Sequence, residues 1–132
     1  MANIEIICRS FDGSYSGING THNLDVTQRA FFRAVVTVGM QRFRDLFRLG
    51  WRGFFHRFGM GLSALSFLEQ RGSSLCLSAE YIGLDMSEKG VATYWYGMAL
   101  AKLVAEAELS IPWLSHVDRM KAIGALQTSS TR

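Results

Sequence analysis

The chain has 132 residues and a formal net charge of +3, with 48% hydrophobic residues, 19% charged residues and a single proline. This length suits one domain, residues 1–132, and the composition excludes an intrinsically disordered chain. Arginines interrupt every apolar run in the first half, so none reaches the roughly 18 residues that a membrane-spanning helix needs.

The first predicted elements are a strand and a loop. Residues 4–9 form a short apolar run typical of a β-strand, and the cluster of Gly, Ser and Asn that follows predicts a flexible loop over 10–24. The start of the chain carries Glu5 and no basic residue ahead of a long apolar region, so it lacks the charge order of a secretory signal. We therefore expect a cytoplasmic protein.

A long amphipathic helix is predicted next. Apolar residues recur at helical spacing from Gln28 to Trp51, with Asp25 or Thr27 as the N-cap. Glycines follow closely in residues 50–61, and we expect the helix to break there before a second apolar stretch.

The second half of the chain predicts a strand and then a capped helix. Residues 75–82 mix apolar and small side chains and end at a turn, which favours a strand. Asp85 and Glu88 have the spacing of a capping box for a helix that begins near Ser87. The sequence thus predicts a mostly helical α+β domain with a small sheet built from residues near 4–9 and 75–82.

The end of the chain predicts a last helix and a tail. Ser110 and Pro112 are typical of a helix start, and apolar residues continue at helical spacing after them. Residues 127–132 are polar, and we expect them to form a frayed tail.

The two cysteines and three histidines predict no metal site. Cys8 and Cys76 lie far apart in the sequence without a CxxC spacing, so we interpret them as free thiols, and a bridge would require their two strands to be neighbours. No ligand spacing or nucleotide-binding motif occurs, so we predict no cofactor.

Positive charge gathers in one segment. Residues 27–58 contain seven arginines, no lysine and one acid, Asp45. On a single helix at about 100° per residue, five of these arginines fall within about 140° of each other. Arginine suits phosphate and carboxylate, and nearby aromatics offer stacking surfaces. The predicted contact residues for an anionic partner are Arg29, Arg33, Arg44, Arg48, Arg52 and Trp51.

Several interpretations of this segment stay open. A solvated helix face with no further role fits the pattern, and the aromatics Trp51, Phe54, Phe55, His56 and Phe58 could equally belong to the core. As a function we expect a non-catalytic binding module that contacts nucleic acid or an acidic protein surface, with a homo-oligomer interface as another reading. A membrane surface ranks behind these, because a core around residues 75–126 would need the same apolar face.

An enzyme is the alternative from another class. Glu80, Asp85 and Glu88 cluster where the second predicted strand meets a helix, and paired carboxylates there could hold Mg²⁺. Such a chain would be the N-terminal part or a remnant of a metal-dependent, nuclease-like enzyme. Helix capping explains Asp85 and Glu88 equally directly, so no catalytic residue is predicted.

Overall fold

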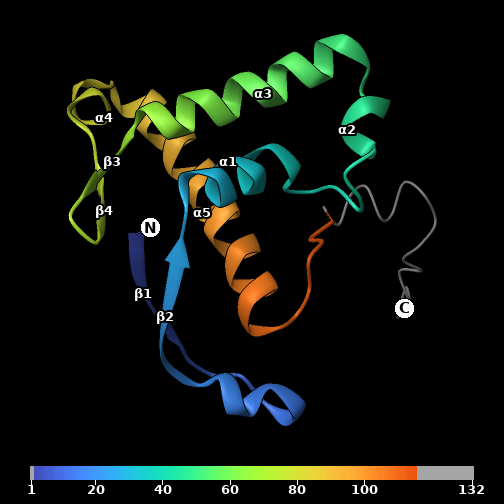
Figure 1. Cartoon of the computed structure of the whole chain (residues 1–132), viewed down its shortest axis with the longest axis vertical. Coiled ribbons are helices and arrows are strands. Elements are labelled where there is room, and N and C mark those ends of the chain that lie inside the picture. Colours follow the sequence, from blue (N-terminus) through green and yellow to red (C-terminus); the bar gives the residue numbers. More distant parts are fainter. Residues whose placement is uncertain (1, 116–132) are drawn as a thin grey trace, which may run out of the picture.

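The computed structural model describes residues 2–115, which form an α+β domain (Figure 1). Helix α3 (Gly50–Ser66) crosses the top of the molecule above α1 (Gln28–Thr37) and α5 (Met86–Glu108). A small sheet lies on the left in this view. The predicted fold class is confirmed, because most of the described chain is helical and the sheet is small.

The predicted loop over 10–24 is only partly a loop. Strand β1 (Ala2–Cys8) pairs antiparallel with β2 (Gly20–Val26) over their whole length, from Ala2 opposite Val26 to Cys8 opposite Gly20. A 3₁₀ helix, η1 (Gly13–Ile18), joins the two strands. The Asn19 side chain closes this connection by bonding both the N–H and the carbonyl of Phe11. The residues after Asn19 are therefore a strand, and the loop prediction is wrong for them.

The sheet has the order β2-β1-β4-β3. Strand β3 (Leu68–Arg71) and β4 (Ser74–Leu77) form a second antiparallel hairpin, which joins β1 in parallel at the single pair Asn3 and Ser74.

The strand predicted over 75–82 ends early. After Leu77, the Ser78 hydroxyl caps the short helix α4 (Ala79–Gly83), so the second part of the prediction is corrected from strand to helix. The two predicted strands are neighbours, and their cysteines, Cys8 and Cys76, are both free thiols.

The single helix predicted over 28–51 is three helices. Thr27, one of the two predicted N-caps, caps α1 by accepting a hydrogen bond from the Ala30 N–H at 3.0 Å. The helix stops at Thr37, and Gly39 adopts a positive φ of 79° that only glycine reaches easily. A four-residue helix, α2 (Asp45–Arg48), follows, and Gly50 at φ 64° starts α3 in a new direction. The break predicted within 50–61 is absent, because α3 runs without interruption to Ser66.

The core lies between the sheet, α1, α3 and α5. Its buried members are Leu24, Val26, Phe31, Ala34, Val35, Ala64, Ala99 and Leu103. Tyr96 packs its ring 5.6 Å from that of Phe31 and donates its hydroxyl to the Ala64 carbonyl at 3.1 Å. Partial burial, and secondarily Tyr81, raises the pKa of Tyr96 to about 12, so this donor keeps its proton at neutral pH.

The chain after α5 departs from the predicted last helix. Residues 109–115 are not helical, and Ser110 has a positive φ of 55°. Ser115 forms an isolated parallel bridge with Gly39, which brings this segment beside the end of α1. The remainder of the predicted helix and the tail at 127–132 lie outside the described residues.

Candidate functional site

The six predicted contact residues lie on three helices instead of one face. Arg29 and Arg33 belong to α1, Arg44 precedes α2, Arg48 ends it, and Trp51 and Arg52 begin α3. The angular argument that grouped them on one helix is therefore wrong, because the chain turns at Gly39 and again at Gly50.

A groove between α1 and the α2–α3 segment brings two of these arginines to an aromatic surface. Its volume is about 690 Å³, and Arg29 and Arg33 lie on the α1 side. Most of the remaining wall is apolar: Ala30, Phe32, Val36, Phe43, Leu46, Phe47, Phe54 and Phe58. The groove therefore offers apolar contact with positive charge along one side.

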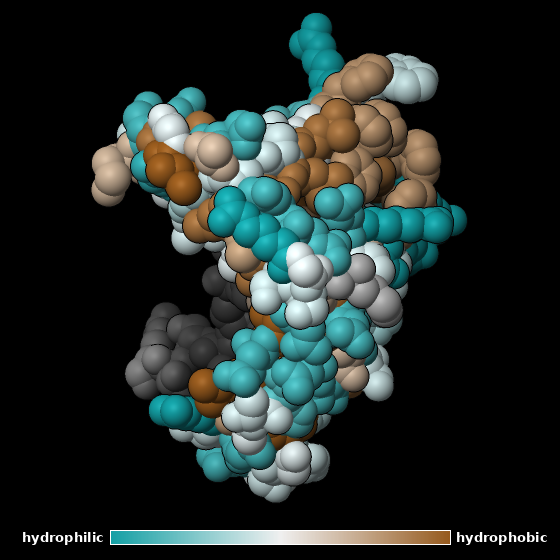
Figure 2. Space-filling view, turned by 60° about the vertical axis from the view of Figure 1, so that its left-hand side comes forward, coloured by the Kyte–Doolittle hydropathy of each residue, from teal (hydrophilic) through white to brown (hydrophobic). Residues whose placement is uncertain are grey.

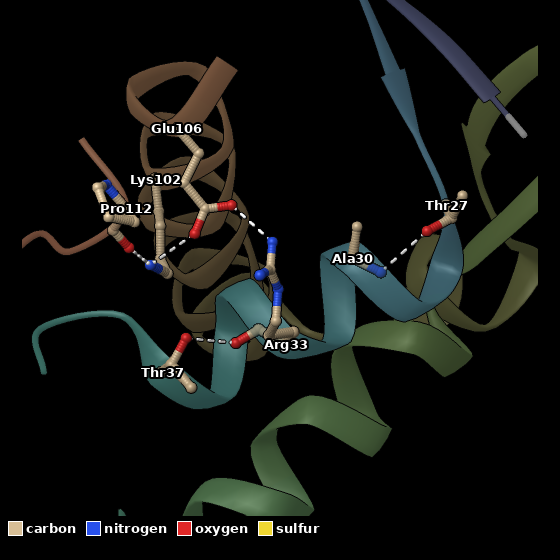
Figure 3. Close-up of polar contacts among 7 residues, drawn as sticks. All are labelled: Thr27, Ala30, Arg33, Thr37, Lys102, Glu106 and Pro112. Carbon is tan, nitrogen blue, oxygen red and sulfur yellow. Dashed lines mark hydrogen bonds and ion pairs between the residues drawn. The ribbon is translucent and has the colours of Figure 1, made fainter. Parts of the chain in front are cut away.

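Arg33 also holds the fold together. Its guanidinium bonds the Glu106 carboxylate at 2.6 Å, and the other oxygen of that carboxylate accepts a bond from Lys102 at 3.0 Å (Figure 3). Lys102 also donates to the Pro112 carbonyl and lies 4.8 Å from the centre of the Trp113 ring. Arg33 is thus partly neutralised, and its main role is to join α1 to α5.

Asp45 is the only acid in residues 27–58, and it faces inward. Its side chain is buried and accepts a bond from the Gln41 N–H at 3.3 Å. Arg48 lies 3.7 Å from it, at the long end of ion-pair distances. Among residues 2–115, Arg29, Arg44 and Arg52 form no ion pair with an acid. Within residues 2–115, acids therefore compensate only part of the positive charge of this surface.

A stripe of large apolar side chains runs along the outer side of α3. Trp51, Phe55, Phe58 and Leu62 fall within about 60° of one another at 100° per residue. Trp51 is 78% exposed and Phe55 is 63% exposed. We call these four residues the α3 stripe.

The apolar surface continues onto α2. Phe43, Phe47 and Leu49 are also exposed, and Phe47 reaches 63%. Figure 2 shows this end of the molecule at the upper right, where brown and tan side chains gather and teal side chains project beside them. Seven large apolar side chains between residues 43 and 62 thus face solvent in the part of the chain that the structure describes. Exposed apolar surface of this kind marks interaction sites.

The aromatic rings of this surface pack on one another. Trp51 stacks on Phe55 with ring centres 6.0 Å apart, and Phe54 stacks on Phe58 at 5.9 Å and on Phe47 at 5.9 Å. The rings form a continuous layer from the groove to the α3 stripe. The sequence named four of these aromatics without deciding between core and surface. The structure places Phe54 and Phe58 in the groove wall and leaves Trp51 and Phe55 outside it.

The sequence did not single out Phe43, Phe47, Leu49 or Leu62 as parts of this surface. Leu62 follows Trp51, Phe55 and Phe58 at the i, i+4, i+7, i+11 spacing, which is visible in the sequence once α3 is known to be unbroken. Nothing in that spacing tells which apolar face of α3 meets the core.

A second, smaller cavity lies between α3 and α5. It holds about 430 Å³ and includes His56, Trp95 and Met98 in its lining. Arg57 also lines it, but its Nη1 atom donates to the Val38 carbonyl at 2.9 Å, so this arginine is tied to the end of α1.

The acids at 80–88 act as helix caps. Asp85 accepts a bond from the Glu88 N–H at 2.9 Å, and Glu88 accepts one from the Asp85 N–H at 3.2 Å, which confirms the predicted capping box. Hydrogen bonds from its own backbone N–H and from Ser78 lower the pKa of Glu80 in the first turn of α4. Within residues 2–115, no group of three or more His, Cys, Asp or Glu side chains could hold a metal ion.

We expect Asp85→Ala to lower the free energy of unfolding by about 1 kcal/mol, because it removes the N-cap of α5. Chemical denaturation of the variant and the parent measures this difference. Mg²⁺ titration by calorimetry is the control. Saturable Mg²⁺ binding that disappears in Asp85→Ala would contradict a purely structural role.

In the described part of the chain, no helix has both the length and the apolar character needed to cross a membrane. Comparisons with protein-family models, with curated proteins and with solved structures find no match to this chain.

Proposed function

We propose that the chain is a non-catalytic binding module that holds an anionic partner on the surface formed by α1, α2 and α3. The observation that carries this proposal is the charge imbalance of residues 27–58. This segment has seven arginines and one acid, the buried Asp45, and among residues 2–115 Arg29, Arg44 and Arg52 form no ion pair with any acid. Like charges held this close repel one another, and an anionic partner would relieve the repulsion.

The start of α3 adds to this positive potential. No acid lies in its first turn, and no side chain caps its N-terminus. The partial positive charge of the helix end therefore adds to that of Arg48 and Arg52. Nucleic acid and an acidic protein surface both supply the opposite charge. The free thiols Cys8 and Cys76 fit a reducing cytoplasm as the setting.

The test is a charge reversal, Arg44→Glu with Arg52→Glu. Neither arginine has an ion-pair partner among the described residues, so the fold should tolerate the change. The control, Arg9→Glu with Arg71→Glu, reverses two exposed charges in the strand region, where Arg71 forms an exposed ion pair with Glu69 at 3.0 Å that adds little to stability. Binding of mixed-sequence oligonucleotides and of polyglutamate is measured at several salt concentrations.

We expect the surface variant to bind both polyanions more weakly than the control does. Each phosphate contact removed should flatten the salt dependence by about 0.9 on double-stranded DNA or about 0.7 on a single strand. Nucleic acid is excluded as the partner if no oligonucleotide binds below about 100 μM at physiological salt. Equal losses in the surface variant and the control would show that net charge alone matters and would overturn the proposal.

A further inference from the structure

The α3 stripe distinguishes among anionic partners, because it is apolar as well as flanked by arginine. α3 turns a different side to the core: Gly61 and Ala64 are buried, whereas Trp51, Phe55 and Leu62 are exposed. The core therefore does not use Trp51, Phe55 or Leu62, whereas Phe58 packs edge-on against Phe32 of α1 with ring centres 5.2 Å apart. A membrane surface ranked below other partners because the core was expected to need this apolar face. That reason does not apply to Trp51, Phe55 and Leu62, which stay exposed.

The shape of the α3 stripe favours a deformable lipid interface over a rigid protein surface. The stripe is an exposed row of side chains along a helix, and Trp51 projects from it with 78% of its surface exposed. A protein partner would need a concave surface shaped to this row. A bilayer interface admits projecting side chains without such a match, and Trp, Phe and Leu beside arginine are the residues that interfacial helices use.

The packing of the rings disfavours nucleic acid. Bases stack on free aromatic faces, and Trp51 and Phe55 stack on each other, as do Phe54 and Phe58, so each of these rings has one face already in contact with another ring. Leu49 and Leu62 enlarge the exposed surface with aliphatic groups that offer a base no stacking.

Charge disfavours a second copy of the chain. Two copies joined through this face would bring two sets of arginines together, and Asp45, the only acid of the segment, is buried in each copy. An anionic bilayer supplies negative charge on both sides of the inserted stripe.

We propose that the anionic partner is a lipid bilayer and that α3 lies in the plane of its interface. This proposal rests on the proposed function. Trp51, Phe55 and Leu62 enter the boundary between headgroups and acyl chains. Arg44, Arg48 and Arg52 contact lipid phosphates, since arginine can keep its stem in an apolar layer while its head stays among polar groups.

The experiment compares vesicles of phosphatidylcholine with vesicles that also contain phosphatidylserine. The test variant is Trp51→Ser with Phe55→Ser, which keeps every charge. Its matched control, Ile82→Ser with Met86→Ser, removes two apolar side chains that are similarly exposed on another part of the molecule. Cosedimentation measures binding, and size-exclusion chromatography measures the oligomeric state.

We expect the parent and the control to bind the phosphatidylserine vesicles and the test variant to lose at least tenfold in affinity. Polyanion binding in solution should be unchanged in the test variant, because its arginines are intact. Tryptophan fluorescence of the parent should shift to the blue with vesicles, and the shift should be reduced in Trp51→Phe.

Other outcomes overturn the bilayer proposal in distinguishable ways. Polyanion binding that depends on Arg44 and Arg52, without vesicle binding, leaves the proposed function standing and removes the bilayer. Loss of oligonucleotide binding in Trp51→Ser with Phe55→Ser would assign the rings to nucleic acid. A dimer of the parent that dissociates in this variant would identify the stripe as an interface between copies.

Discussion

We expect Glu106→Ala to lower the free energy of unfolding by about 3 to 5 kcal/mol. Lys102 is almost fully buried, and the Glu106 carboxylate at 3.0 Å is its charged partner among the described residues. Without that carboxylate, the ammonium group keeps only the Pro112 carbonyl and the Trp113 ring. A buried charge that loses its counter-ion is costly, and urea denaturation measures the cost.

Two further variants separate this cause from a general loss of contacts. Arg33→Ala removes the outer partner of the same carboxylate, and it should cost about 1 kcal/mol or less because Arg33 is more than half exposed. Lys102→Met combined with Glu106→Gln removes both charges, and it should be less destabilised than Glu106→Ala. A cost below about 1 kcal/mol for Glu106→Ala would contradict the buried pair.

The second large effect is expected at Gly61, where α3 packs against side chains of α1. A Cβ atom at this position would lie 2.6 Å from the Phe32 ring and 2.8 Å from the Val36 side chain. We expect Gly61→Ala to lower the free energy of unfolding by about 1 to 3 kcal/mol, because the Phe32 ring, the Val36 side chain or one of the two helices must shift. Phe32 and Val36 also line the groove, so the substitution should change the shape of the groove as well.

Gly59→Ala is the matched control two residues earlier on the same helix. A Cβ atom there meets no other atom within 4 Å, so alanine should raise stability by about 0.5 to 1 kcal/mol through helix propensity. The two substitutions should thus have opposite signs in thermal or urea unfolding. Stabilisation by both would mean that α1 and α3 separate at little cost and that the groove is not fixed by this contact.

The elements predicted correctly from the sequence are those with local chemical signals. The Asp85 and Glu88 box marks the start of α5 with two side chains and two backbone N–H groups, and all four make the expected bonds. Thr27 marks the start of α1 in a similar way. Such signals need no knowledge of the rest of the fold.

The missed elements depend on contacts that are distant in the sequence. Strand β2 is mostly polar, and only Leu24 and Val26 are buried in it, so its pairing with β1 decides its conformation. Helix α3 continues through its glycines because Gly61 and Ala64 allow close packing against the rest of the core, which outweighs weak helix propensity.

The charge of the candidate site could be predicted from the sequence, but its arrangement could not, because that arrangement depends on contacts distant in the sequence. Composition alone shows the excess of arginine in residues 27–58. The helical period of the apolar residues continues past Gly39, so no change of period indicates that the chain turns there. Only the fold divides the arginines among three helices and leaves the α3 stripe outside the core.

The uncapped start of α3 has a consequence for motion in this part of the molecule. Gly50 and Gly53 occupy the first turn, and neither a side-chain cap nor an acid stabilises its free N–H groups. Beyond this turn, Gly61 and Ala64 are buried against the core. The first turn should therefore open more often than the second half of α3, and its amide hydrogens should exchange with solvent sooner. An anion held there would act as the missing cap, so the segment that contacts the partner would also be the segment whose local opening the partner suppresses.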